Sequence, residues 1–359
     1  TRAAVAGTLT DPRNLGALDL RLRLSGSSLG NLYPLTGVTL PDSPAYETDG
    51  HLLVKLHEPG GASFRYEDFH GNLGFVASQP RPKLSGALVS NQLLFADLKP
   101  LIGADSNAEQ KARGGASKQP AGKVLPVEEF KTDRWRAMDA DVEFTGRKIV
   151  HSEDLPFTDL YTHVVLDDGN LRLEPLRFGV AGGKLDAQIS LNGRTTPLQG
   201  RAKLTARGFQ LKQLFPSFEP MRTSFGPLNG DADIAGTGNS VAALLGTANG
   251  NLKMLVNDGA VSRDLMEIAG LNVGNYLVGK IFGDKEVDIN CAAASLGIKN
   301  GLASTDLFVF DTENAIIYID GTVNFKQEQL DLKISPESKG FRLLSLRSPL
   351  YVRGPFAKP

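Results

Sequence analysis

Several features that mark common classes of protein are missing from this chain of 359 residues. It has one cysteine, Cys291, so no disulfide can form within the chain. No run approaches the ~18 consecutive apolar residues that a membrane-spanning helix needs. The formal net charge is -1, and lysine and arginine are scattered singly. This charge pattern argues against a nucleic-acid-binding protein.

Recognisable catalytic motifs are also scarce. The segment Gly26-Ser27-Ser28-Leu29-Gly30 matches the G-x-S-x-G pattern of a nucleophile elbow. This segment belongs to a unit that recurs twice more in the chain, as described below. The other two copies have Leu94 and Gln210 at the position of Ser28, so the repeated unit does not require a hydroxyl there. The five histidines show no spacing typical of a metal site. The sequence therefore predicts no enzyme, metal or cofactor, and a hydrolase that uses Ser28 stays the one enzymatic alternative.

What the chain does have is a pattern of alternating apolar and polar residues. Hydrophobic residues make up 41% and charged residues 22% of the chain, as in folded globular proteins. In Leu18–Leu24, leucine alternates with aspartate and arginine, which indicates a strand with one apolar and one polar face. We count on the order of 20 such segments, far above the ~4–6 strands of an ordinary sheet.

Pairs of turn-forming residues separate these segments. They are Asp168-Gly169, Gly182-Gly183, Asp258-Gly259 and Asn300-Gly301. Such pairs supply the positive φ angles of tight hairpin turns. The sequence therefore predicts a mainly β protein, a long antiparallel meander that is curved or twisted.

A repeated unit accompanies this alternation. Its three copies run from Leu20 to Leu35, from Leu88 to Leu101 and from Ala202 to Pro216, and they align without gaps on their prolines. Each copy indicates a strand followed by a short helical turn that proline ends. Three copies favour an extended array over one compact core.

A few helices are expected beside the strands. Residues 262–282 are predicted to form the longest helix, with Ser262 as its N-cap and Gly283 as its stop. A shorter helix is predicted from about Ser240 to Leu245.

The organisation along the chain follows from these elements. Residues 103–134 begin with small and polar residues and are predicted to be a flexible loop. The predicted divisions are 1–102 and 135–238 as two parts of one β-groove, 103–134 as the loop between them, and 239–359 as a C-terminal region that contains helix 262–282.

One apolar face repeated on so many strands has to be covered. The predicted helices are too few to cover it, so two solutions remain open. Two sheets could pack as a sandwich, or one sheet could curl along its length around a hydrophobic groove. A smooth aliphatic lining suits acyl chains better than one shaped ligand. The predicted lining residues are Leu18, Leu20, Leu22, Leu24, Leu52, Val54, Leu56, Val142, Phe144, Val164, Leu166, Leu171, Leu173, Leu185, Ile189, Leu191, Leu204, Leu252, Met254, Val256, Ile317, Ile319, Val323, Phe325, Leu330 and Leu332.

The second half of the chain resembles a known family. Residues 245–254 and 258–260, with the later segments 288–293, 300–303, 331–336 and 340–349, are similar to the signature of the AsmA family of Gram-negative envelope proteins. The upstream segment Asp97-Leu98-Lys99-Pro100-Leu101 resembles that family's repeated unit. The resemblance covers nearly the whole chain.

The resemblance implies a location and a role. The family is similar to bridge-like lipid transfer proteins, with an N-terminal helix in the inner membrane and the bulk of the protein in the periplasm. Thr1–Gly7 has neither an initiator methionine nor the apolar core of a signal peptide, so we expect the anchor to lie upstream, in a longer protein. The resemblance carries over no catalytic residues.

Two functions are consistent with these observations. The first is transfer of lipid, with phospholipid acyl chains as the bound partner, between the inner and outer membranes through a hydrophobic β-groove. This activity would support outer-membrane integrity. The alternative is a structural or regulatory protein with a closed, dry sheet that assists outer-membrane assembly. An outer-membrane or periplasmic protein partner is not identified by any motif.

Overall fold

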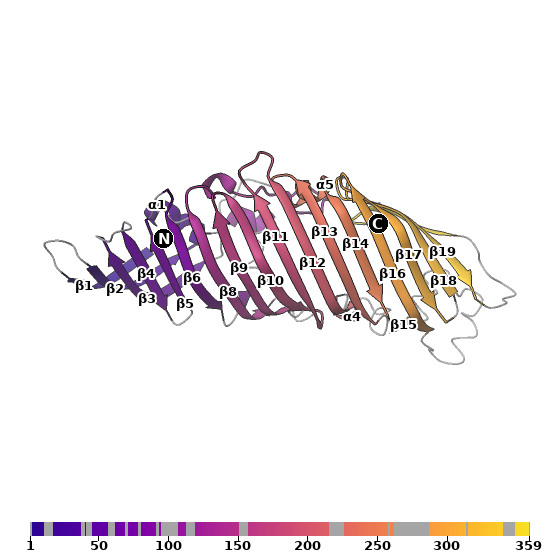
Figure 1. Ribbon diagram of the computed structural model, residues 1–359, viewed down its shortest axis with the longest axis horizontal. Helices are drawn as coiled ribbons and strands as arrows, with labels where there is room; N and C mark the ends of the chain where they lie inside the picture. The colour runs from indigo at the N-terminus through magenta and orange to yellow at the C-terminus, as the bar shows by residue number, and fades with distance from the viewer. Residues whose placement is uncertain are drawn as a thin grey trace.

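The computed structural model describes most of the chain and shows one long sheet (Figure 1). The strands lie obliquely across an elongated body, with N-terminal strands at one end and C-terminal strands at the other. The residues that the structure describes are 2–10, 17–36, 40, 45–56, 62–68, 71–77, 80–90, 93–94, 107–112, 119–150, 157–214, 226–257, 259–261, 287–313, 315–339 and 349–358.

Within the described residues the sheet contains 20 strands, which confirms the predicted mainly β class. In chain order they are β1 (Arg2–Thr10), β2 (Ala17–Gly26), β3 (Tyr46–Lys55), β4 (Ser63–Asp68), β5 (Gly71–Val76), β6 (Lys83–Ser90), β7 (Leu93–Leu94), β8 (Asp139–Val150), β9 (Phe157–Asp167), β10 (Asn170–Val180), β11 (Gly183–Asn192), β12 (Gln199–Gln210), β13 (Pro227–Thr237), β14 (Asn249–Val256), β15 (Gly259–Val261), β16 (Val287–Lys299), β17 (Leu302–Thr312), β18 (Ala315–Asn324), β19 (Gln329–Ser338) and β20 (Leu350–Pro355).

The strand order follows the chain order, as expected for a meander. Neighbouring strands pair antiparallel from β1 to β6 and again from β8 to β20. The exception is β8, which pairs parallel with β6 and β7. A parallel neighbour needs a long crossover connection. The segment between β7 and β8 is that connection.

The helices of the described residues are short and lie in the connections between strands. They are η1 (Leu29–Leu32), α1 (Tyr33–Thr36), α3 (Asn107–Ala112), η3 (Thr132–Arg134), α4 (Leu211–Leu214) and α5 (Val241–Gly246). The helix predicted near Ser240 is confirmed as α5, whose first turn is capped because the Ser240 hydroxyl accepts a hydrogen bond from Ala243 N. The predicted helix 262–282 lies outside the described residues.

Two copies of the predicted repeat have the expected strand and helical turn. β2 is followed by η1 and α1, and β12 is followed by α4. The prediction that proline ends the turn is wrong in the first copy, because Pro34 lies inside α1. Proline is tolerated in the first turn of a helix, where backbone N–H groups have no intrahelical partner. Residues 91–92 and 95–101 of the middle copy lie outside the described part of the chain.

The predicted hairpin turns have three different outcomes. Asp168-Gly169 and Asn300-Gly301 are confirmed, with positive φ at both residues of each pair. The turn predicted at Gly182-Gly183 is shifted by one residue and uses Ala181-Gly182.

The hairpin predicted at Asp258-Gly259 is wrong. Asp258 lies outside the described residues, but β14 and β15 on either side of it both pair antiparallel with β16. Val256 faces Ala292 and Gly259 faces Ile289, so the two strands keep one register. They are therefore two parts of one interrupted strand, and the turn-like pair marks a break along it. β6 and β7 are related in the same way along β8.

Glycine within strands lets neighbouring backbones approach closely on one face of the sheet. Gly250 in β14 has a φ of +149°, and a Cβ added there would lie 2.0 Å from the carbonyl oxygen of Asp233 in β13. Gly86 in β6 has a φ of +147°, and its Cβ would lie 2.2 Å from the carbonyl oxygen of Asn72. Only glycine adopts these conformations readily. Such kinks are a known means of curving a sheet.

Candidate functional site

The strand registers place the predicted lining residues on one face of the sheet. Residues directly opposite each other in an antiparallel pair point to the same side. Leu22 in β2 faces Val5 in β1 and Gly50 in β3. On the same face, Leu52 in β3 faces Tyr66 in β4, which faces Leu73 in β5. Leu20 faces Leu52 in the same way. We call this side of the sheet the apolar face.

The apolar face continues across the parallel junction. Val142 in β8 faces Gly86 in β6 and Val164 in β9. Val164 in turn faces Leu173 in β10, and Leu173 faces Ile189 in β11. The apolar face is therefore continuous across the parallel pairing of β6 with β8.

The same face extends to the C-terminal strands. Leu252 in β14 faces Ala232 in β13 and Leu296 in β16. Further along, Val323 in β18 faces Leu330 in β19. Every predicted lining residue that lies in a strand belongs to this face, whereas Leu56 and Phe325 directly follow β3 and β18. That these residues hold lipid stays a prediction.

Most of the predicted lining residues are half-buried. Only Leu166, Val256 and Ile317 are fully buried, at 8%, 4% and 6% relative exposure, and none of the set is exposed. Each half-buried side chain therefore packs against protein while part of its surface stays accessible. All of the described strands belong to one sheet, so half-burial is the expected state of this face.

Packing on the apolar face is densest toward the C-terminal strands. One buried cluster contains Leu296, Ile298 and Ala303, and Leu252 and Met254 pack against it. A second cluster contains Val256 and Ile317. A smaller cluster lies near the parallel junction, where Leu84 and Met138 are buried and Val142 packs against them.

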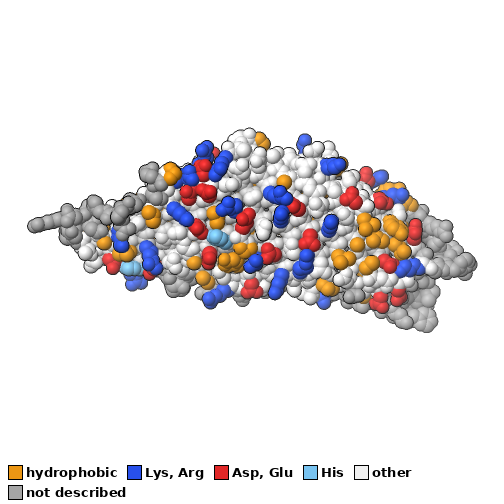
Figure 2. Space-filling model, in the orientation of Figure 1, with side chains coloured by type: hydrophobic (Ala, Val, Ile, Leu, Met, Phe, Trp, Pro, Cys, Tyr) orange, Lys and Arg blue, Asp and Glu red, His pale blue; other side chains and the backbone are white. Residues whose placement is uncertain are grey.

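The opposite face carries paired charges (Figure 2). Asp49 in β3 accepts hydrogen bonds from Arg21 and Arg23 of β2, at 2.9 and 2.8 Å. These hydrogen bonds lower the pKa of Asp49 to about 2, and the one from Arg21 has the larger effect. Exposed pairs of this kind add little stability. Their effect is to make this side a charged surface, which we call the polar face.

Cross-strand pairs of the same kind recur along the polar face. Further examples are Arg177–Asp186, Arg201–Asp233, Arg207–Asp231 and Arg353–Asp331. A region across β14 to β18 departs from this pattern, since Leu255, Leu307 and Tyr318 are exposed there. Figure 2 shows this apolar region toward the C-terminal end of the body.

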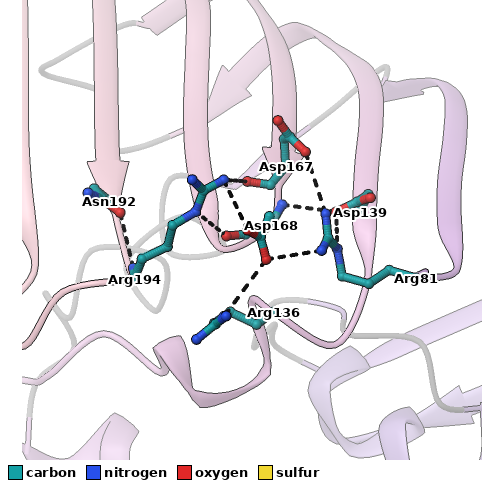
Figure 3. A network of polar contacts seen from close by, with 7 residues as sticks. All are labelled: Arg81, Arg136, Asp139, Asp167, Asp168, Asn192 and Arg194. Carbon is teal, nitrogen blue, oxygen red and sulfur yellow. Dashed lines mark hydrogen bonds and ion pairs between the residues drawn. The ribbon is translucent and has the colours of Figure 1, made fainter. Parts of the chain in front are cut away.

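A polar network joins several turns at one rim of the sheet (Figure 3). Arg81, just before β6, donates to Asp139 at the start of β8 at 2.9 Å and to Asp168 in the β9–β10 turn at 3.0 Å. Arg194, in the β11–β12 connection, donates to the carbonyl oxygen of Asp168 at 2.6 Å. Arg136 also pairs with Asp168, at 3.8 Å. Sequence reasoning did not predict this network.

The electrostatics of this network hold the parallel junction together. Burial alone would raise the pKa of Asp139, but the hydrogen bonds from Arg81 and from the backbone of Asp168 outweigh it, so the pKa lies below its usual value. The ionised carboxylate therefore fixes the strand after the crossover beside β6. Each arginine in this network contacts an aspartate, so the arrangement is structural in character.

Ser28 and two of the histidines have structural partners. The Ser28 side chain caps η1 by accepting a hydrogen bond from Gly30 N at 3.3 Å. His163 in β9 contacts Asp141 in β8 at 2.7 Å, and His51 in β3 contacts Asp19 in β2. Both histidines therefore belong to the polar face. The other three histidines lie outside the described residues.

Within the part of the chain that the structure describes, no helix has both the length and the apolar character needed to cross a membrane.

The described strands form a single sheet, and one side of that sheet is the extended apolar face. The sequence matches the AsmA family over residues 1–308. It is also 55% identical, over 376 aligned positions, to the AsmA family protein YhjG of Escherichia coli (strain K12). The alignment covers 100% of this chain and 55% of that protein, so the chain spans about half the length of the curated relative it matches. No solved structure matches the chain.

The chain belongs to the AsmA family, as the motifs in its second half indicated. Membership suggests a role associated with the cell envelope.

Proposed function

We propose that the apolar face binds the acyl chains of phospholipid and carries them between the inner and outer membranes of a Gram-negative envelope. The observation that supports this proposal is the series of mostly half-buried apolar side chains on one face of the sheet from β2 to β20. Aliphatic surface without polar groups has no preference for one head group or one chain length. It therefore suits a conduit for hydrocarbon better than a site for a single ligand.

The energetics favour a long face of this kind. Exposing one methylene to water costs ~0.8 kcal/mol, so moving a chain of about 16 carbons through water costs on the order of 12 kcal/mol. A face that stays apolar along its length avoids most of that cost at every step. The head group can stay in water throughout, so no charged group has to be buried.

The proposal includes a location. The protein would lie in the periplasm and be held at the inner membrane by a helix outside this sequence. Its long axis, from the β1 end to the β20 end, would then be the direction of transfer. The polar face, with its cross-strand ion pairs, would face the aqueous compartment.

Photo-crosslinking from matched neighbours on one strand tests the proposal. A photoreactive amino acid at Leu252 lies on the apolar face, whereas the same residue at Lys253 lies on the polar face. Leu22 and Arg21 form a second matched pair in β2. We expect phospholipid adducts from Leu252 and Leu22 in cells, and at most background from their neighbours.

Two outcomes of this test would contradict the proposal. Adducts from Lys253 and Arg21 alone would mean that lipid contacts the wrong face. Adducts from neither pair, with a folded protein, would favour the alternative of a closed sheet that assists outer-membrane assembly without carrying lipid. A Ser28→Ala variant that retains full function would dispose of the hydrolase.

A further inference from the structure

One irregular segment runs along a rim of the sheet, and we call residues 119–138 the strap. At one end it contacts the β18–β19 turn. Val124 N donates to a carboxylate oxygen of Glu328 at 2.5 Å, and Leu125 N donates to the same atom at 3.4 Å. Lys123 Nζ donates to the carbonyl oxygen of Gln327 at 2.9 Å.

The middle of the strap contacts the connection between β13 and β14. Ala242 N, in the first turn of α5, donates to the carbonyl oxygen of Pro126 at 2.9 Å. Phe130 N donates to the carbonyl oxygen of Asn239 at 2.7 Å. The strap is therefore bonded to the sheet through its backbone, which fixes its path whatever side chains it carries.

The other end of the strap contacts two more turns and the apolar face. A Cβ added at Gly193, in the β11–β12 connection, would lie 2.9 Å from Cε3 of Trp135, so the indole ring lies directly on that glycine. Arg136 pairs with Asp168 in the β9–β10 turn (Figure 3). Met138 is completely buried, in the cluster with Leu84.

All of these turns lie at the same rim. In an antiparallel meander, consecutive turns alternate between the two rims. The β9–β10, β11–β12, β13–β14 and β18–β19 connections therefore share one rim, the edge where Figure 1 labels α5. The β10–β11 turn at Ala181-Gly182 lies at the opposite rim, as does α4 after β12. The contacts described above all belong to the α5 rim.

We propose that the strap closes the α5 rim of the apolar face, so that lipid enters and leaves across the opposite rim, with Glu328 as the latch of the strap. This inference rests on the proposed lipid-binding function and adds a side of entry to it. The head groups of bound lipids would then lie along the rim that contains Ala181-Gly182.

Glu328 has the features expected of a latch. It is 3% exposed, although it lies in a turn and has a positive φ of 57°. A carboxylate in such a place requires hydrogen-bond donors, and the strap supplies two backbone N–H groups. The contact joins residues 204 positions apart in the sequence, so it is a tertiary contact and not part of a local turn.

The first arm of the test measures the latch without lipid. In a Glu328→Ala variant, we expect the amide hydrogens of Val124 and Leu125 to exchange at least ~10-fold faster than in the wild type. Glu328→Gln keeps an acceptor oxygen and should show a smaller increase. Asp331→Ala is the matched control, because Asp331 lies three residues further on, is exposed and pairs with Arg353 on the polar face. Unchanged exchange in Glu328→Ala would show that Glu328 is not a latch.

The second arm locates the head group. Purified protein is loaded from vesicles of phosphatidylethanolamine that carries a photoreactive group on its amine, and adducts are mapped by mass spectrometry. On β10, Phe178 lies near the rim opposite the strap and Leu171 lies near the strap. We expect adducts around Phe178 that exceed those around Leu171 by at least ~5-fold, and we expect this ratio to fall in Glu328→Ala.

The outcomes separate the two proposals. Equal labelling at both rims, or labelling mainly around Leu171, would overturn the side of entry and leave lipid binding intact. No labelling at any residue of the apolar face, with the exchange result as expected, would contradict the lipid-binding function and leave only a structural strap.

Discussion

The N-terminal edge of the sheet and the interior strand β16 carry the same alternating pattern with different degrees of burial. In β1 every residue is exposed, including Val5 at 58% and Leu9 at 39%, although both lie in the apolar row. In β16 the residues of the same face are buried, with Leu296 and Ile298 both at 7%. β16 has neighbours on both sides, whereas β1 has one described neighbour, β2. Alternation thus decides which side of a strand is apolar, while adjacent strands and curvature decide how far that side is covered.

Truncating an apolar side chain in each of these two strands should give the largest difference. We expect Leu296→Ala to lower the free energy of unfolding by about 2–5 kcal/mol, because it leaves a cavity in a buried cluster. Val5→Ala should change it by no more than ~0.5 kcal/mol, because the side chain is already exposed. Urea unfolding followed by circular dichroism measures both. Equal losses would mean that β1 is covered in solution.

Adding a methyl group to a strand glycine gives the next largest effect. Gly250→Ala should cost about 2–3 kcal/mol, since its φ of +149° is strained for alanine and the new Cβ would meet the backbone of β13. Gly7→Ala also places a Cβ within 2.1 Å of a backbone oxygen, that of Asp19. β1 can shift away from β2 with little resistance, so we expect less than half of that cost. A cost at Gly7 as large as at Gly250 would show that the β1 edge is held rigidly.

Loss of a helix cap should have a smaller effect. Ser240→Ala removes the acceptor for Ala243 N and should cost about 1 kcal/mol, because Ser240 is buried and its partner amide would be left unpaired. Ser28→Ala removes the corresponding acceptor for Gly30 N, near the β1 end, at the longer distance of 3.3 Å. We expect its cost to be no greater than that at Ser240. Thermal unfolding of both variants provides the measurement, and a larger loss at Ser28 would contradict the comparison.

The polar face at the β1 end should show the smallest effect, a dependence on pH. The pKa of Asp49 is lowered to about 2, so its ionised form is favoured in the folded state. Stability from this group is complete above the unfolded pKa near ~3.9 and is lost as the pH falls through about 2. Asp49→Asn should remove that part of the dependence on pH. The free energy of unfolding of the wild type and of the variant is compared between about pH 4 and about pH 2. If it falls equally in both, the ion pairs of Asp49 contribute nothing to stability.

Much of the fold could be predicted from alternation and turn chemistry. The segment Leu18–Leu24 has leucine on one face and charged residues on the other, and this pattern predicts both a strand and which of its faces is apolar. The Asp168-Gly169 turn could be predicted because a turn with positive φ at two consecutive residues favours asparagine, aspartate and glycine. Both signals are local.

The features that could not be predicted depend on pairing between distant segments. β14 and β15 look like two arms of a hairpin in sequence, and only their shared register on β16 shows one interrupted strand. The parallel pairing of β6 and β8 likewise has no local signal. The contact of Val124 with Glu328 depends on where the crossover passes, which no periodicity encodes. The network around Asp168 was missed for the same reason.

An experimental structure of the protein with a brominated phospholipid would test the central claim most directly. The account predicts bromine density along the apolar face, near Leu22, Val164 and Leu252, with none over Arg21 or Lys253 on the polar face. Aliphatic side chains that interdigitate along the whole face, with no density between them and no room for a hydrocarbon chain, would contradict it.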